Sequence, residues 1–137
     1  MGTVYAEITV KNASDTACAK QGFIKEDQIR SVSVTAIVDT GAMTLIITEG
    51  LRQQLGLRIE GLREIKLANF QAVTAGVTEP VEVHWKNRFF IGNAWVLSDW
   101  GTPLLGLLPL EYMDLMVDPV NQELVGVHGD KELGMVF

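Results

Sequence analysis

The sequence contains a single cysteine, Cys18, so the chain cannot form an internal disulfide. Nothing therefore indicates folding in an oxidising compartment. No histidine-containing motif accompanies Cys18, and we interpret it as an ordinary thiol and not as a nucleophile. The first residues also lack the basic segment and apolar run that are typical of a secretory signal. We expect a cytoplasmic protein.

Positive charge is scarce as well. The 11 lysines and arginines are outnumbered by 17 aspartates and glutamates, which gives a net charge of −6, and the basic residues are scattered along the chain. Binding to phosphates needs a clustered basic surface, so we expect no nucleic-acid partner. The most apolar window, residues 103–117, is interrupted by Pro109, Glu111 and Asp114, and we expect no membrane association.

Motifs for metal binding are also missing. The two histidines, His84 and His128, lie far apart, and neither the HExxH nor the CxxC spacing occurs. We expect His84 on a strand surface, His128 in the C-terminal tail, and no metal or other cofactor. Trp85, Trp95 and Trp100 are expected to anchor the core or an interface, because an acidic chain disfavours a stacking platform for nucleic acid.

What the sequence does contain is a series of short, β-branched segments separated by turn residues. This pattern predicts one mostly-β, barrel-like domain over residues 1–137. Two short helices are expected, at 49–55 between an N-cap at Thr48 and a stop at Gly56, and at 109–113 beginning with Pro109. Residues 11–29 are polar and predict an irregular connection, and Lys86-Asn87 predicts a two-residue turn. Strands are expected at 3–10, 31–38, 43–47, 57–67, 77–85, 88–92, 94–97, 103–108, 115–118 (closing the sheet) and 122–127.

The chemistry is carried by Asp39, which ends the β-branched segment 31–38 and opens the tetrapeptide Asp39-Thr40-Gly41-Ala42. Two carboxylates held close together cannot both ionise, so one can activate water while the other protonates the substrate. In such a site the Thr40 hydroxyl would bond to the partner loop, Gly41 would allow a close backbone approach, and Ala42 would leave room. A chain of 137 residues is too short for two lobes, so the second carboxylate must come from a second copy.

These residues resemble the retropepsin-like aspartic proteases, including their bacterial members, over about residues 31–126. Residues 36–42 resemble the active-site strand and loop of the family, residues 48–57 the helix after it, residues 66–76 the substrate-covering flap, and residues 103–119 the supporting strand and helix. The resemblance implies the closed β-barrel of the acid protease fold, a homodimer, an extended peptide or protein substrate and no cofactor. It also implies catalysis by Asp39, substrate contacts from Ala68, Asn69 and Phe70 on the flap, and support of the loop by Leu104, Leu105 and Gly106.

Three alternatives remain open from the sequence. Asp99, in Ser98-Asp99-Trp100-Gly101, is a faint second match to the catalytic triplet, although a loop aspartate is the plainer interpretation, and Asp118 is expected to be a turn residue. The flap carries Asn69-Phe70 where Asn-Gly would form a turn more easily, which favours a weak or inactive module that binds peptides or dimerises. In the last alternative, Asp39-Thr40-Gly41 is only a turn within a β-barrel assembly subunit.

Overall fold

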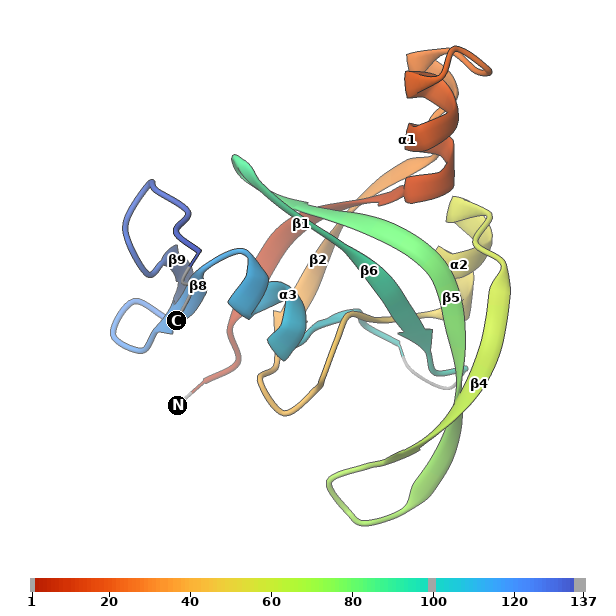
Figure 1. Ribbon diagram of the computed structural model, residues 1–137. Helices are drawn as coiled ribbons and strands as arrows, with labels where there is room; N and C mark the ends of the chain where they lie inside the picture. The colour runs from red at the N-terminus through yellow and green to blue at the C-terminus, as the bar shows by residue number, and fades with distance from the viewer. Residues whose placement is uncertain (1, 99–100, 135–137) are drawn as a thin grey trace.

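A computed structural model describes residues 2–98 and 101–134 of the chain. Strands predominate, as predicted, and three α-helices and one short 3-10 helix accompany them (Figure 1). The strands are β1 (Tyr5–Asn12), β2 (Ser31–Val38), β3 (Ile46–Ile47), β4 (Ile59–Lys66), β5 (Ala72–Trp85), β6 (Arg88–Val96), β7 (Leu104–Leu105), β8 (Leu115–Asp118) and β9 (Glu123–Gly126). The helices are α1 (Ala13–Lys20), η1 (Glu26–Gln28), α2 (Glu49–Leu55) and α3 (Leu107–Tyr112).

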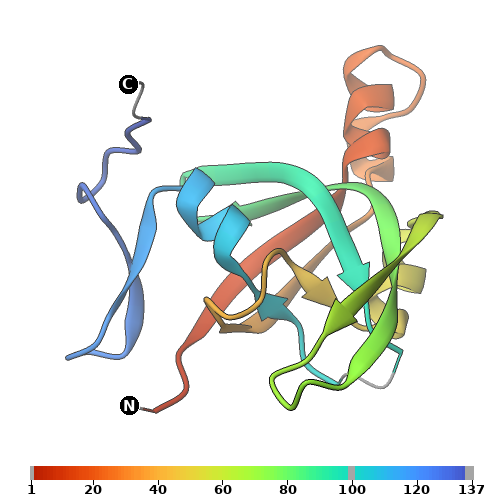
Figure 2. The ribbon, with the colours of Figure 1, turned by 60° about the horizontal axis from the view of Figure 1, so that its bottom comes forward.

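Seven of the strands form one mixed sheet in the order β1-β2-β7-β3-β6-β5-β4. An additional pairing between β1 and β5 closes six of them into a ring, the small barrel that the sequence predicts, and leaves β4 outside it on β5. The long strand β5 changes partner along one edge: its first half pairs with β4 and its second half with β1. The β4–β5 hairpin therefore extends beyond the ring (Figure 2).

The interior of the ring is filled by alternate residues of the strands, as the two-residue period of a strand requires. In β1 the buried positions are Ala6, Ile8, Val10 and Asn12, and the residues between them face outward. Leucines and isoleucines of β3 and α2 and the methionine after α3 complete the cluster. Its apolar side chains account for most of the free energy that holds the ring together.

Several expectations about the elements were wrong. Residues 11–29 are not irregular, because β1 continues to Asn12 and is followed by α1 and η1, which project away from the ring (Figure 1). The predicted strand 43–47 shrinks to two residues, since the chain from Ala42 to Leu45 packs as a loop against α3. The segments 88–92 and 94–97 form one strand, β6. β8 does not close the main sheet but pairs with β9 alone.

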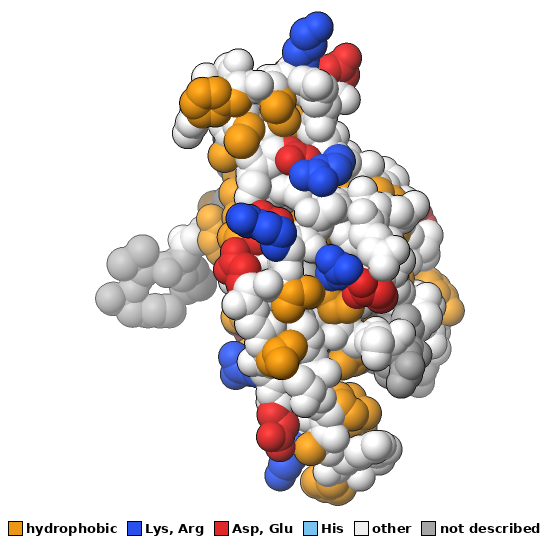
Figure 3. Space-filling view, turned by 90° about the vertical axis from the view of Figure 1, so that its right-hand side faces the viewer, with side chains coloured by type: hydrophobic (Ala, Val, Ile, Leu, Met, Phe, Trp, Pro, Cys, Tyr) orange, Lys and Arg blue, Asp and Glu red, His pale blue; other side chains and the backbone are white. Residues whose placement is uncertain are grey.

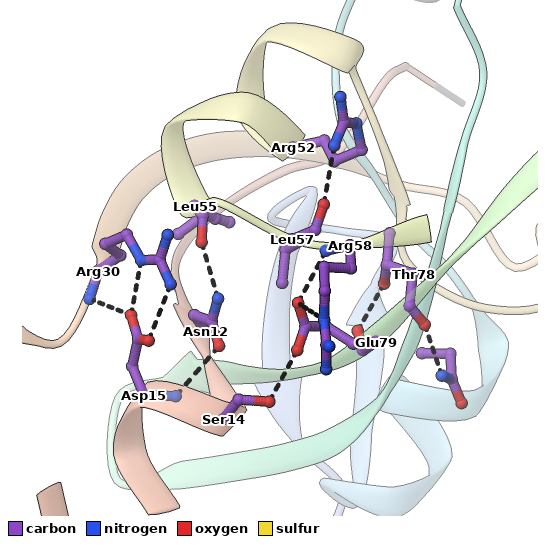
Figure 4. A network of polar contacts seen from close by, with 11 residues as sticks. Asn12, Ser14, Asp15, Arg30, Arg52, Leu55, Leu57, Arg58, Thr78 and Glu79 are labelled. Carbon is purple, nitrogen blue, oxygen red and sulfur yellow. Dashed lines mark hydrogen bonds and ion pairs between the residues drawn. The ribbon is translucent and has the colours of Figure 1, made fainter. Parts of the chain in front are cut away.

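The α1 excursion is held by polar contacts that short-range sequence patterns do not show. Asn12 caps the helix by accepting a hydrogen bond from Asp15 N at 3.1 Å, and its amide donates to Leu55 O at 2.9 Å (Figure 4). Asp15 accepts from the Arg30 backbone and guanidinium at 2.8–3.0 Å. The hydrogen bond from the Arg30 side chain holds the pKa of Asp15 below its usual value. These contacts join the two ends of the excursion to each other and to the end of α2.

A second buried carboxylate, Glu79, lies where β5 changes partner. It accepts hydrogen bonds from Arg58 N and the Ser14 hydroxyl, both at 2.7 Å, and the Arg58 guanidinium lies at 3.5 Å (Figure 4). Burial would by itself raise the pKa of Glu79, but these donors together hold it below its usual value. Acidic and basic side chains lie next to each other on the face shown in Figure 3.

The Glu79 contacts generate a stability prediction. Glu79→Gln keeps the shape of the side chain but removes the charge that the donors stabilise, and we expect it to lower the free energy of unfolding at pH 7 by about 1–2 kcal/mol. A carboxyl with a lowered folded-state pKa stabilises the protein above its unfolded value of about 4.3 and loses that effect as the pH falls through the folded value. Urea titrations from pH 7 to pH 3 should therefore show the difference from wild type shrinking below about pH 4.

Candidate active site

Asp39 follows β2 directly and begins a tight loop. Its amide donates to Leu105 O at 3.0 Å, and its carbonyl accepts from Ala42 N at 3.1 Å. The carboxylate oxygen Oδ1 accepts from Gly41 N at 2.9 Å, so the loop holds the side chain in one orientation. Asp39 is half-buried, whereas Thr40 and Gly41 are exposed. The Thr40 hydroxyl makes no hydrogen bond to other described residues, and it is therefore available to a partner.

The loop rests on Leu104-Leu105-Gly106. Leu104 and Leu105 form β7, which runs parallel to the end of β2, with Ile37 opposite Leu104 and Val38 opposite Leu105. After Gly106 the chain enters α3, whose first amide, Leu107 N, donates to Ala42 O at 2.8 Å. Two strands and one helix terminus thus fix the backbone on either side of Asp39, which is the rigidity that a preorganised site needs.

Gly106 is required at its position by the closeness of the loop. A Cβ atom there would lie 2.6 Å from Ala42 O and closer still to Thr44 O, both of which are backbone atoms. The Ala42 carbonyl cannot move away without breaking its hydrogen bond from Leu107 N. The glycine of the Leu-Leu-Gly triplet therefore has a packing reason, because it lets the active-site loop lie directly on the start of α3.

A groove of about 410 Å³ opens beside Asp39, a size typical of ligand sites. It is lined on one side by the loop after Asp39 and by β7, and on another by the end of β4 and the flap. Asp39 is the sole carboxylate among the described residues that line it. The lining residues are Asp39, Gly41, Ala42, Ile46, Ile65, Lys66, Leu67, Ala68, Asn69, Trp95, Leu97 and Leu104.

The flap is the tip of the β4–β5 hairpin, where Lys66 pairs with Ala72. Leu67 N donates to Gln71 O and Phe70 N donates to Leu67 O, both at 2.9 Å. These bonds close a tight turn with Phe70 at φ 65°, in the left-handed region that glycine usually occupies and that is costly for a bulky side chain. The Phe70 ring is 85% exposed and does not line the groove.

The structure brings together most of the residues that the sequence predicts for the site. Among the flap and triplet residues, Ala68, Asn69 and Leu104 line the groove with the loop, while Leu105 and Gly106 support the loop from behind. Thr40 and Phe70 point elsewhere, toward solvent. Sequence reasoning missed four wall residues, Ile46, Ile65, Trp95 and Leu97. Their only signal is that each belongs to a predicted strand, which does not say which strands meet.

The two histidines and Asp118 make contacts that stabilise the fold. His84 lies 3.0 Å from Glu82 Oε1 and stacks on Phe89, and His128 lies 2.6 Å from Asp114 Oδ2, so His128 is tied to the fold. Asp118 is the turn residue expected, accepting from Val120 N at 2.9 Å.

Two tryptophans differ in their surroundings. Trp85 is buried in the core, as expected for an anchor, whereas Trp95 lines the groove. Asp99 and Trp100 lie outside the described residues. Within the described ranges, no group of three or more metal-binding side chains gathers, and no helix is both long and apolar enough to cross a membrane.

Comparison with known proteins supports the fold. No protein-family model and no curated protein sequence matches the chain. Two solved structures are similar: the retroviral protease-like domain of Ddi1 from Leishmania major, and a retropepsin-like aspartic protease from Rickettsia conorii. The first has a TM-score of 0.56 at 16% identity over 91% of this chain and 84% of its own. The second has a TM-score of 0.50 at 21% identity over 85% of this chain and 77% of its own. The chain therefore has the retropepsin-like fold.

The packing at Gly106 leads to a prediction about stability. Gly106→Ala should lower the free energy of unfolding by about 2–3 kcal/mol, because its methyl group would overlap two backbone carbonyls in a packed region. Gly61→Ala is the matched control, since nothing lies within 4 Å of a Cβ atom there. Urea denaturation measures both. Equal stability of the two variants would show that the loop does not rest on Gly106.

The flap turn leads to a second prediction. Phe70→Gly removes the strain of a left-handed bulky residue, and it should slow hydrogen exchange of the Leu67 amide about threefold. Phe70→Ala keeps a Cβ atom in the same conformation and should leave the exchange rate near that of wild type. Hydrogen exchange measured by NMR separates the two. If alanine slowed exchange as much as glycine, the ring and not the backbone would be the source of strain.

Proposed function

We propose that the chain is an aspartic endopeptidase that is active as a homodimer, with one Asp39 from each copy in a shared site. The proposal is carried by one observation: the groove beside Asp39 has a single carboxylate among its described residues, on a rigid and partly exposed loop. One carboxylate cannot serve as base toward water and as acid toward the substrate at the same time. A second copy placed across the exposed Thr40-Gly41 edge would supply the missing group.

The chemistry follows from the pairing of two acids, for which aspartic proteases are the established example. Two carboxyl groups a few ångströms apart share one proton, so one is ionised and the other is neutral. The ionised Asp39 takes a proton from water, which attacks the carbonyl carbon of the peptide, and the neutral Asp39 gives its proton to the carbonyl oxygen. When the tetrahedral intermediate collapses and the C–N bond breaks, the Asp39 that took the proton from water gives it to the amine nitrogen. The other Asp39 takes a proton from a hydroxyl of the intermediate, which leaves as the carboxylic acid product. The pair then returns to its starting state.

The groove fits an extended peptide. Its walls are largely apolar, from Ile46, Ile65, Leu97 and Leu104, and one wall is the end of a hairpin with main-chain groups at its tip. A strand-like peptide binds such a site through main-chain hydrogen bonds, with alternate side chains entering pockets. The flap of each copy would cover the peptide from above.

The partner surface is expected on the face that carries the active-site loop and the β8–β9 hairpin. That hairpin pairs only with itself among the described residues, and two-stranded sheets are marginal on their own. Its free edges could extend across a dimer axis, which would remove an exposed edge from each copy. Met116 and Val127 on or beside it are about half exposed, and Val120 at its turn is 85% exposed, so apolar surface is available for burial.

A second candidate, a dimeric module that binds peptides without cutting them, is favoured by Phe70. A flap whose tip requires a bulky residue at positive φ is harder to rearrange than one built on glycine. Such a module would use the same groove and the same fold. Cleavage itself distinguishes the two candidates.

We expect Asp39→Asn to abolish cleavage of an unstructured protein between pH 4 and 7 and to leave the fold intact, because an amide cannot exchange the proton. Asp27→Asn is the matched control: it also removes one charge, from an exposed aspartate on η1, and should cut at the wild-type rate. Cleavage is followed by mass spectrometry and the fold by circular dichroism. If the Asp39→Asn variant cut the substrate at the wild-type rate, the proposed chemistry would be excluded. A folded wild-type dimer that cuts nothing would favour the binding module.

A further inference from the structure

A second hollow of about 300 Å³ adjoins the groove, and Trp95 is a wall of both. It is bounded by the loop after Asp39, by β4, β5 and β6, and by the start of α3. Most of its surface is apolar and comes from exposed or half-buried side chains, of which Phe90 also packs against the core and against Tyr112. The lining residues are Met43, Thr44, Arg63, Val77, Phe90, Gly92, Asn93, Trp95 and Leu108.

Arg63 is the one charged side chain among the described residues that line this hollow. Its guanidinium carbon lies 5.1 Å from the centre of the Trp95 ring, which is the geometry of a cation–π contact. No ion pair joins Arg63 to a carboxylate of the described residues. Stacking on the ring leaves the edges of the guanidinium, with their N–H groups, free for an acceptor.

The other polar side chains of the hollow already have partners. The Thr44 hydroxyl donates to Asn93 O at 3.1 Å, and the Asn93 amide donates to Thr78 O at 2.6 Å. These bonds hold the walls together, and the guanidinium is the charged group of the hollow that has hydrogen-bond donors to offer. The hollow thus offers apolar walls and one positioned cation.

We propose that this hollow is a specificity subsite for a glutamate side chain of an extended substrate, and that Arg63 binds the carboxylate of this glutamate. The inference rests on the proposed function, because it needs a peptide lying in the groove. The methylenes of glutamate match the apolar walls at Met43 and Leu108, and the planar carboxylate matches the fork of the guanidinium. Lys66, on the same strand, lines the groove and is a second positive charge along the proposed path of the peptide.

The position of the glutamate follows from the shared wall. Side chains that point to the same side of an extended peptide are two residues apart. Trp95 lines both the groove and the hollow, so we expect an apolar side chain in the groove to place residue i±2 at the hollow. The subsite therefore selects an apolar residue and a glutamate separated by one position.

The test uses sets of peptides that carry Glu, Gln or Lys at each position around a central apolar residue, cut by the chain of residues 1–137. When the varied position is two residues from the apolar residue, wild type should cut the Glu peptide about fivefold faster than the Gln peptide. Arg63→Gln should bring the ratio of these two rates close to one. Arg63→Glu should favour a lysine at the same position. Lys20→Gln, on α1, is the control that removes an equal charge at a distance and should keep the wild-type ratio.

A binding arm separates this inference from the proposed function. The same peptide pairs are titrated against Asp39→Asn protein, with and without Arg63→Gln, and followed by fluorescence anisotropy. Cleavage without a Glu preference overturns the subsite and leaves the protease intact. If wild type cuts no peptide but the Asp39→Asn protein binds Glu peptides more tightly than Gln peptides, and Arg63→Gln removes that difference, the subsite is supported and the protease is contradicted. Equal affinity for Glu and Gln peptides in both arms overturns the subsite.

Discussion

The site depends on the contact between the active-site loop and the start of α3. Gly106 has no Cβ, so the carbonyls of Ala42 and Thr44 can lie directly over it, and Leu107 N can donate to Ala42 O. The hydrogen bond from Asp39 N to Leu105 O joins the other end of the loop to β7. Between these two attachments the carboxylate has little freedom. The proposed reaction needs two carboxylates held a few ångströms apart. Packing at Gly106, which is far from Asp39 in the sequence but in contact with its loop, would therefore affect that reaction.

The long strand β5 connects this site to the rest of the ring. Its second half belongs to the ring, next to β1, and its first half carries the flap. The change of partner occurs at Glu79, whose buried carboxylate holds Arg58 N and the Ser14 hydroxyl at that point. The flap is therefore joined to the ring by a polar junction, and Trp95 on the neighbouring strand β6 lines the groove.

Elements whose bounds depend on adjacent residues could be predicted from the sequence. Strand β2 has the predicted bounds, and Thr48 and Gly56 begin and end α2 as expected, with Thr48 accepting from Leu51 N and Gly56 at φ 62°. Asp39 stands at the groove because a motif of adjacent residues places it there. The helix α1 could not be predicted in this way, because its small polar residues form no apolar stripe and its place depends on the pair of Asp15 with Arg30. The wall residues Ile46 and Trp95 meet through a parallel pairing of β3 with β6, which only the topology reveals.

The central claim, that two copies complete one site, is tested most directly by mixing subunits. Wild-type protein is mixed with an equal amount of Asp39→Asn protein, the subunits are allowed to exchange, and cleavage is compared with wild type diluted by buffer to the same wild-type concentration. Random pairing places about half of the wild-type chains in mixed dimers. The account predicts that these mixed dimers are inactive, so the rate falls to about half, and further as the variant is added in excess. A rate that stays at the wild-type value despite exchange would mean that one Asp39 suffices, and would contradict the shared site.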